Sequence, residues 1–282
     1  MLQQDEFNDV RVWGPAPNYP LVKSVNHSRK SIIEIAGPCS IESEEQAEVV
    51  AKVLAANKIQ YMRGGVYRAG TYPPHQLGDK GLQFTLLFAF HRVAQKYGLK
   101  NIVEVIDLKQ LDFILPEADV LQVGARQMQN YGLLRAVSET GKPVTLKRHF
   151  GCTLDEFLGA AEYLLKGNTK DLTLIERGTA SFMKHSRFQA DITLIAALKR
   201  ITGLPVLIDA SHGTGRRDLV APVTMAGLAA GADGYLIETH PNPSESISDS
   251  QQAYPLEDFP TLVKWARAEH KRHKEAPWNK MQ

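Results

Sequence analysis

The chain has 282 residues, of which 43% are hydrophobic, and this length suits one large domain because (β/α)8 barrels typically take about 250 residues. The formal net charge is only +2 and the Lys and Arg residues are spread along the chain, which argues against nucleic acid or an anionic membrane surface as a partner. Two cysteines, Cys39 and Cys152, with no secretory signal pattern and no apolar run of about 18 residues, predict a cytoplasmic protein with reduced thiols.

Taken in order, residues 1–30 lack a clear periodicity, and we interpret them as a short N-terminal extension. From residue 31 onward one unit repeats: a short apolar strand, a polar tip and an amphipathic segment of helical length. The predicted strands end at 36–40, 62–65, 103–107, 121–126, 144–148, 174–178, 206–209 and 235–238. Eight such alternations predict a closed (β/α)8 TIM barrel rather than an open doubly wound sheet.

The segments between the strands are predicted to be helices, at 44–56, 81–97, 108–113, 131–139, 154–165, 192–202 and 220–230. Thr153 is a plausible helix cap because Asp155 and Glu156 place negative charge in the following turn. A last helix, Leu256–His270, would complete the catalytic barrel at 31–270 and leave Lys271–Gln282 as a polar tail.

Four residues at strand tips could hold a divalent metal: Cys39, His212, Glu238 and Asp249. They follow or end the first, seventh and eighth predicted strands, which are neighbours once a barrel closes. A thiolate, an imidazole and two carboxylates suit Mn²⁺, Fe²⁺, Co²⁺ or Zn²⁺ better than Ca²⁺ or Mg²⁺. The alternative is that these are a small buried cysteine, a strand-end charge and a turn aspartate, which is weaker for the set than for any one member.

A second set of tip residues is basic: Arg63, Arg126, Lys147 and Arg177. Several cations around one barrel mouth are costly without anions, so the sequence predicts a site for a dense anion such as a phosphate with a carboxylate. The alternative is that some of these side chains point outward and form surface ion pairs.

These residues lie in motifs that resemble one family, and the resemblance runs from about residue 32 to 259. The motifs are Ala36-Gly-Pro-Cys-Ser-Ile-Glu-Ser43, Met62-Arg-Gly-Gly65, Gln122-Val-Gly-Ala-Arg126, Leu146-Lys-Arg148, Glu176-Arg-Gly178, Asp209-Ala-Ser-His212, Gly215-Arg-Arg-Asp218 and Glu238-Thr-His-Pro241. They resemble the 3-deoxy-D-arabino-heptulosonate 7-phosphate (DAHP) synthases of the short, type I beta kind. The 3-deoxy-D-manno-octulosonate 8-phosphate (KDO8P) synthases share the same scaffold.

The resemblance implies a metal-assisted condensation of phosphoenolpyruvate with an aldehyde sugar phosphate, erythrose 4-phosphate in DAHP synthases, which opens aromatic amino acid biosynthesis by the shikimate pathway. It implies a metal held by Cys39, His212, Glu238 and Asp249, and phosphoenolpyruvate gripped by Arg63, Arg126, Lys147 and Arg177. Lys147, or His212 through metal-bound water, would move the proton of the reaction, and Cys39 belongs to the same catalytic centre. Family members usually form homodimers or homotetramers.

One segment departs from the family pattern, and it is the one that selects the aldehyde. Where the family has Lys-Pro-Arg-Thr-Ser-Pro, this chain has Arg68-Ala-Gly-Thr-Tyr-Pro73, so a phosphate-binding arginine becomes Gly70 while Thr71 is kept. Further on, Thr-Arg-Asn-Thr becomes Ser186-Arg-Phe-Gln189, which keeps Arg187. Arg68, Thr71 and Arg187 are therefore the candidates for binding the aldehyde substrate.

Three functions stay open at this point. The first is a DAHP synthase, and the second is a sister synthase that joins phosphoenolpyruvate to another aldehyde in specialised metabolism. Gly70 is the residue that distinguishes these two functions, because the DAHP synthase pattern has a phosphate-binding arginine at this position. The third is a non-catalytic barrel that binds a metabolite, against which the complete sets of metal-type and cationic residues argue.

Overall fold

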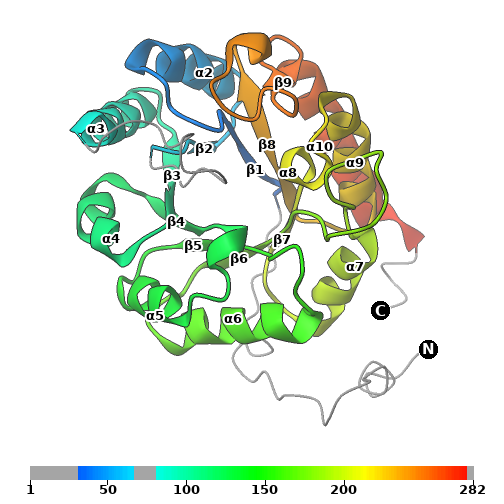
Figure 1. Cartoon of the computed structure of the whole chain (residues 1–282). Coiled ribbons are helices and arrows are strands. Elements are labelled where there is room, and N and C mark those ends of the chain that lie inside the picture. Colours follow the sequence, from blue (N-terminus) through cyan, green and yellow to red (C-terminus); the bar gives the residue numbers. More distant parts are fainter. Residues whose placement is uncertain (1–30, 67–80, 278–282) are drawn as a thin grey trace.

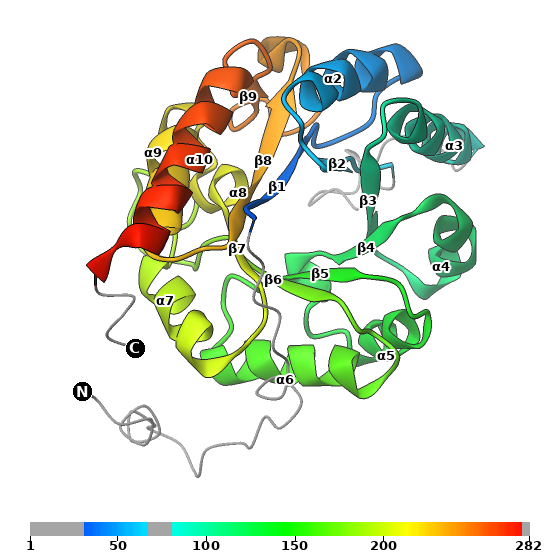
Figure 2. The ribbon, with the colours of Figure 1, turned by 180° about the vertical axis from the view of Figure 1, so that it is seen from behind.

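The computed structural model describes residues 31–66 and 81–277, which form a closed parallel barrel surrounded by helices (Figures 1 and 2). Each strand pairs in parallel with the next, and β8 pairs with β1 through the register Ile35 to Leu236, which closes the ring. The predicted (β/α)8 TIM barrel is confirmed. The barrel strands are β1 (Ile33–Gly37), β2 (Tyr61–Arg63), β3 (Lys100–Val105), β4 (Val120–Val123), β5 (Val144–Lys147), β6 (Leu172–Glu176), β7 (Val206–Asp209) and β8 (Gly234–His240).

The helices form an outer ring around these strands (Figure 1). They are α2 (Glu44–Ala56), α3 (Gly81–Lys96), α4 (Leu108–Ile114), α5 (Tyr131–Glu139), α6 (Leu154–Lys166), α7 (Ile192–Ile201), α9 (Arg217–Ala229) and α10 (Phe259–Glu275), with three short 3-10 turns, η2 (Leu115–Glu117), η3 (Ala125–Gln127) and η4 (Pro243–Glu245). The predicted cap of α6 is confirmed, because the Thr153 side chain accepts a hydrogen bond from the Glu156 backbone N–H and Glu156 reciprocates.

The structure differs from the sequence prediction at the end of the chain. The last helix was predicted to end at His270 and leave 271–282 as a tail, but α10 begins at Phe259 and continues to Glu275. The prediction was wrong here because a polar, mostly exposed stretch resembles a tail. Its basic residues in fact lie in the last helical turn, where positive charge favours a helix C-terminus.

Near the barrel mouth, a helix and a strand were not predicted, and neither were the 3-10 turns η3 and η4. Helix α8 (Ala210–Thr214) follows β7 directly, and the short strand β9 (Tyr254–Pro255) pairs with the end of β8. Helix α9 also begins at Arg217 rather than at Val220. These differences lie in the loops that carry polar residues, where apolar periodicity gives no signal.

Apolar side chains fill two separate spaces. A large core lies between the strands and the outer helices, and a smaller cluster fills the lower barrel interior: Ile33, Ile35, Ile102, Val120, Ile175, Leu207 and Leu236. The strand ends above this interior cluster, at the C-terminal end of the barrel, carry charged side chains instead.

Candidate active site

A pocket lies at the C-terminal ends of the strands, which is where enzymes of this fold place their active sites. Most of the residues predicted from the sequence line it. Its wall contains Cys39, Arg63, Arg126, Lys147, Arg177, Arg187, His212 and Asp249, together with Glu104, Phe150 and Phe188. Arg63, Arg126, Lys147 and Arg177 all line this pocket, which argues against the alternative that they point outward and form surface ion pairs.

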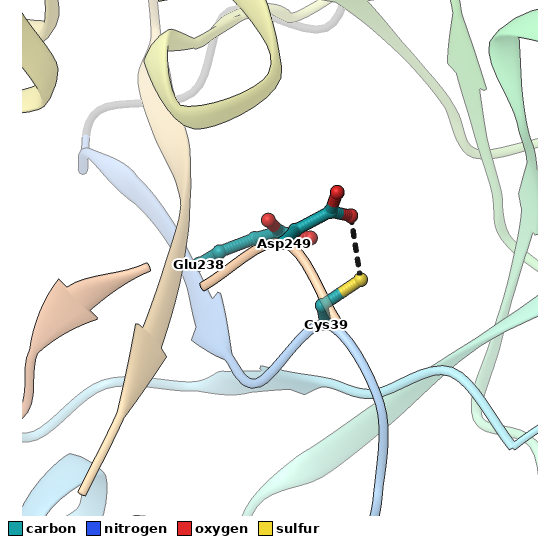
Figure 3. A group of neighbouring side chains, drawn as sticks. All are labelled: Cys39, Glu238 and Asp249. Atoms are coloured by element: carbon teal, nitrogen blue, oxygen red, sulfur yellow. Dashed lines mark hydrogen bonds between the residues drawn. The ribbon is translucent and has the colours of Figure 1, made fainter. Parts of the chain in front are cut away.

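Three of the four predicted metal ligands form a compact group (Figure 3). The ligand atoms of Cys39, Glu238 and Asp249 all lie within 4.8 Å of one another. The Cys39 Sγ atom donates a hydrogen bond to Asp249 Oδ2 at 3.0 Å. Asp249 has φ of 51°, a left-handed conformation that is uncommon outside glycine and concentrates at functional sites.

The fourth predicted ligand, His212, lies in α8 beside this group and contacts it through Glu238. Its Nε2 atom is 3.1 Å from Glu238 Oε1, while its Nδ1 atom is 2.8 Å from Asp209 Oδ2. Burial lowers the pKa of His212, but the Asp209 and Glu238 carboxylates outweigh burial and hold the pKa above its ordinary value. The helix that the sequence did not predict therefore sets the position of this imidazole.

Glu238 connects the metal-type group to the cations. Its carboxylate is fully buried and accepts hydrogen bonds from Arg63 Nη1 at 2.5 Å and from Gln252 Nε2 at 2.5 Å. Burial alone would raise the pKa of Glu238, but the His212 and Arg63 charges keep it well below its usual range. Glu238 is thus a stable anion in the centre of the site.

A second buried ion pair joins the ends of β5 and β7. Lys147 Nζ is 2.8 Å from Asp209 Oδ2 and 3.5 Å from His212 Nδ1. Against the effect of burial, the His212 and Lys147 charges hold the pKa of Asp209 far below its usual range. Asp209 therefore orients both Lys147 and His212.

The sequence analysis gave no role to several residues of this site. Asp209 ends an apolar strand within a motif already singled out, so its position was a usable signal. Gln252 and Glu104 carried no such signal, because an uncharged loop residue and one charge within a strand have many structural explanations. Arg68 and Thr71 lie outside the described residues.

Comparison with known proteins identifies the chain. A model of the DAHP synthetase I family matches residues 24–275. The phospho-2-dehydro-3-deoxyheptonate aldolase of Thermotoga maritima is 38% identical over 270 residues, which cover 90% of this chain and 77% of that protein. The 2-dehydro-3-deoxyphosphooctonate aldolase of Bradyrhizobium diazoefficiens is 29% identical over 245 residues, which cover 82% of this chain and 86% of its own.

Solved structures agree with these relatives. The crystal structure of the Thermotoga maritima DAHP synthase superposes with a TM-score of 0.81 at 36% identity, covering 86% of this chain and 70% of that one. Matches of this extent define the class as synthases built on a (β/α)8 barrel. The chain belongs to the DAHP synthetase I family, which confirms the resemblance drawn from its motifs.

Within the part of the chain that the structure describes, no helix has the length and apolar character needed to span a membrane.

Proposed function

We propose that this protein condenses phosphoenolpyruvate with erythrose 4-phosphate to give DAHP and phosphate. The observation that carries the proposal is the convergence of Arg63, Arg126, Lys147 and Arg177 on one pocket beside Cys39 and Asp249. Membership of the DAHP synthetase I family supports this transferase activity.

The cations suit phosphoenolpyruvate because that substrate carries a phosphate and a carboxylate close together. Arg63, Lys147 and Arg177 are almost fully buried, with 3%, 4% and 5% of their surface exposed. The electrostatic interaction with an anionic ligand is strongest for buried cations, since little water competes for them. Two of the three are already paired with buried carboxylates, which fixes their side chains in place before substrate binds.

The donor set beside these cations fits a divalent transition metal. Cys39, His212, Glu238 and Asp249 would hold the ion, with Mn²⁺, Fe²⁺, Co²⁺ and Zn²⁺ as the candidates. Burial, followed by the Glu238 and Asp249 charges, raises the pKa of the Cys39 thiol well above its ordinary value, and a bound cation would reverse that effect. When bound, the ion would supply Lewis acidity that polarises the aldehyde oxygen.

The chain's own residues would then stabilise the negative charge that develops in the reaction and transfer protons. Carbon 3 of phosphoenolpyruvate attacks the aldehyde, water adds at carbon 2, and the resulting tetrahedral intermediate expels phosphate. The cationic wall stabilises the negative charge that develops during these steps. Lys147 and His212 share Asp209 as a partner. With His212 holding the ion, Lys147 would be the group that moves a proton to or from the reacting oxygen atoms, while Asp209 holds its orientation.

In this function the protein would catalyse the entry step of the shikimate pathway to aromatic amino acids. We further propose that it acts in the cytoplasm and assembles as a homodimer or homotetramer, as its family resemblance implies.

A second candidate is a sister synthase that takes a different aldehyde. Two observations favour it: Gly70 replaces a phosphate-binding arginine of the family pattern, and the aromatic ring of Phe188 lies in the pocket wall. Loss of a charged hydrogen bond from a desolvated site weakens binding by about 1.5–3 kcal/mol unless a neighbour compensates.

The test measures phosphate release from phosphoenolpyruvate with added Mn²⁺, using erythrose 4-phosphate, arabinose 5-phosphate and unphosphorylated aldehydes in parallel. We expect the highest kcat/KM with erythrose 4-phosphate. Faster turnover of another aldehyde would move the assignment to the sister synthase, and a gain of erythrose 4-phosphate use in Gly70→Arg would then explain the difference. Absence of turnover with every acceptor would contradict both.

A further inference from the structure

Phe188 lies in the pocket wall, and the guanidinium groups of two arginines lie near its ring. It lies in the segment 177–191 that joins β6 to α7. The Cζ atom of Arg177 is 4.3 Å from the centroid of its ring, and that of Arg187 is 5.4 Å away. Both distances are within the roughly 6 Å at which a guanidinium is attracted to an aromatic face.

The backbone and a second ring hold Phe188 in this position. Thr179 and Gln189 exchange two backbone hydrogen bonds, of 2.9 and 3.0 Å, which fold the segment back on itself. Gly178 has φ of 93°, and a Cβ atom at that position would lie 2.7 Å from the Phe188 Cβ, so the two residues pack closely. The Phe150 ring stacks on Phe188 at 5.1 Å with an interplanar angle of 27°.

Of the two arginines, Arg177 is the one with a buried atom that is unpartnered within the described part of the chain. Arg177 is 5% exposed, and its buried Nη1 atom has no hydrogen-bond partner among the described residues. Burial lowers the pKa of Arg177 despite the opposing effect of the Asp209 carboxylate, and the nearby positive charge of Arg187 acts in the same direction as burial. The Asp249 carboxylate lies 3.9 Å from Arg187 Nη1 and balances part of that charge. The two arginines still repel each other, whereas the negative face of the Phe188 ring attracts both guanidinium groups.

We propose that Phe188 is a positioning residue that holds Arg177 and Arg187 together in the pocket wall, ready for the phosphate group of a substrate. Phe188 stands where the family pattern has asparagine, so this arrangement is a feature of this chain. It also keeps a second arginine facing the pocket in a chain that has Gly70 in place of a family arginine. The identity of the ligand rests on the proposed function.

The test compares Phe188→Leu with Phe188→Tyr, which keeps the ring, and with Phe182→Leu. Phe182 lies in the same segment but is 95% exposed, so it controls for the loss of a phenylalanine without loss of the contact. Binding of inorganic phosphate is measured by calorimetry at fixed ionic strength, followed by Michaelis constants for phosphoenolpyruvate and erythrose 4-phosphate.

We expect Phe188→Leu to weaken phosphate binding by roughly 3- to 30-fold, the range of a cation–π contact, with a smaller change in kcat. Phe188→Tyr and Phe182→Leu should stay near the wild type. The substrate whose Michaelis constant rises in Phe188→Leu is the one whose phosphate lies against the two arginines. If Phe188→Leu does not fold, Phe150→Leu gives the same readout with a smaller effect, because it removes only the stacking that holds the ring.

Phosphate binding by Phe188→Leu equal to the wild type would overturn the inference and leave the proposed function intact. Phosphate binding that depends on Phe188 in a protein that turns over no aldehyde would support the inference and contradict the proposed function. A wild-type protein that binds neither inorganic phosphate nor phosphoenolpyruvate would overturn both.

Discussion

The lower half of the barrel interior and its upper rim are built on the same strands. The lower half packs apolar side chains together, whereas the rim carries the charged side chains of the site. On β8, Leu236 lies in the lower apolar cluster, and Glu238, two residues later on the same face, lies in the site. On β7, the apolar Leu207 is likewise followed two positions later by the charged Asp209. The same change from an apolar to a charged residue occurs from Ile175 to Arg177, from Tyr61 to Arg63 and from Ile102 to Glu104.

The residues that pack the barrel and the residues that form the site are therefore adjacent layers on the same strands. The lower layer gains stability by removing apolar surface from water. The upper layer holds buried charges, which are costly unless paired, so it contributes function rather than stability. Substitutions in the two layers should therefore separate into effects on folding and effects on turnover.

The largest expected effect lies in the upper layer. Cys39→Ser should lower metal content and reduce turnover at least about 100-fold, because a hydroxyl cannot replace a thiolate ligand. His212→Ala should behave alike. Bound metal is measured after dialysis, turnover as phosphate release, and the melting temperature should change little. Full activity and metal content in Cys39→Ser would exclude the four-ligand site.

The counterpart in the lower layer is Leu236→Ala. The side chain is fully buried in the barrel interior, so truncation should cost about 2–5 kcal/mol in the free energy of unfolding through lost burial and a cavity. Turnover per folded molecule should remain close to the wild type. Urea unfolding and kcat measured on the same preparation check this, and a loss of kcat without a loss of stability would contradict the separation of layers.

The sequence predicted this division well where a strand changes from apolar to charged. Arg63, Lys147, Arg177 and Glu238 were located because each ends an apolar run, and a barrel brings strand ends together. The sequence could not locate Gln252 or the ring contact of Phe188, because these depend on how loops fold over the mouth. The position of His212 relative to Asp209 likewise depends on α8, a five-residue helix too short to show periodicity.

A smaller effect concerns a carboxyl that faces neither layer. Glu176 is fully buried at the end of β6, and its Oε1 atom accepts a hydrogen bond from the Gly178 N–H at 2.8 Å. Burial raises its pKa from 4.5 to about 7 despite that bond and the nearby Arg148. The folded state thus holds a proton that the unfolded state releases, so the contribution of Glu176 to stability is largest below about pH 4.5 and falls until about pH 7.

Glu176→Gln should remove this pH dependence, since the amide can still accept the Gly178 bond but cannot ionise. The shift corresponds to at most about 3 kcal/mol between those pH values. Free energies of unfolding of both proteins, measured at intervals from pH 5 to pH 8, give the difference. If the two free energies of unfolding differ by the same amount at every pH, or if the wild type loses stability relative to Glu176→Gln toward acid, Glu176 is ionised in the folded protein.

The smallest expected effect tests whether the rim recognises its anion by shape as well as by charge. Arg126 lies in η3 and lines the pocket from a more exposed position than the other cations. Arg126→Ala should raise the Michaelis constant for phosphoenolpyruvate by roughly 10- to 100-fold through loss of a charged hydrogen bond. Arg126→Lys keeps the charge but loses the planar fork, so a rise of only about 3- to 10-fold is expected. Equal constants for Lys and wild type would mean that charge alone is used at this position, and an unchanged constant in Arg126→Ala would remove Arg126 from the anion site. Only the second result would narrow recognition of the anion to the buried cations Arg63, Lys147 and Arg177.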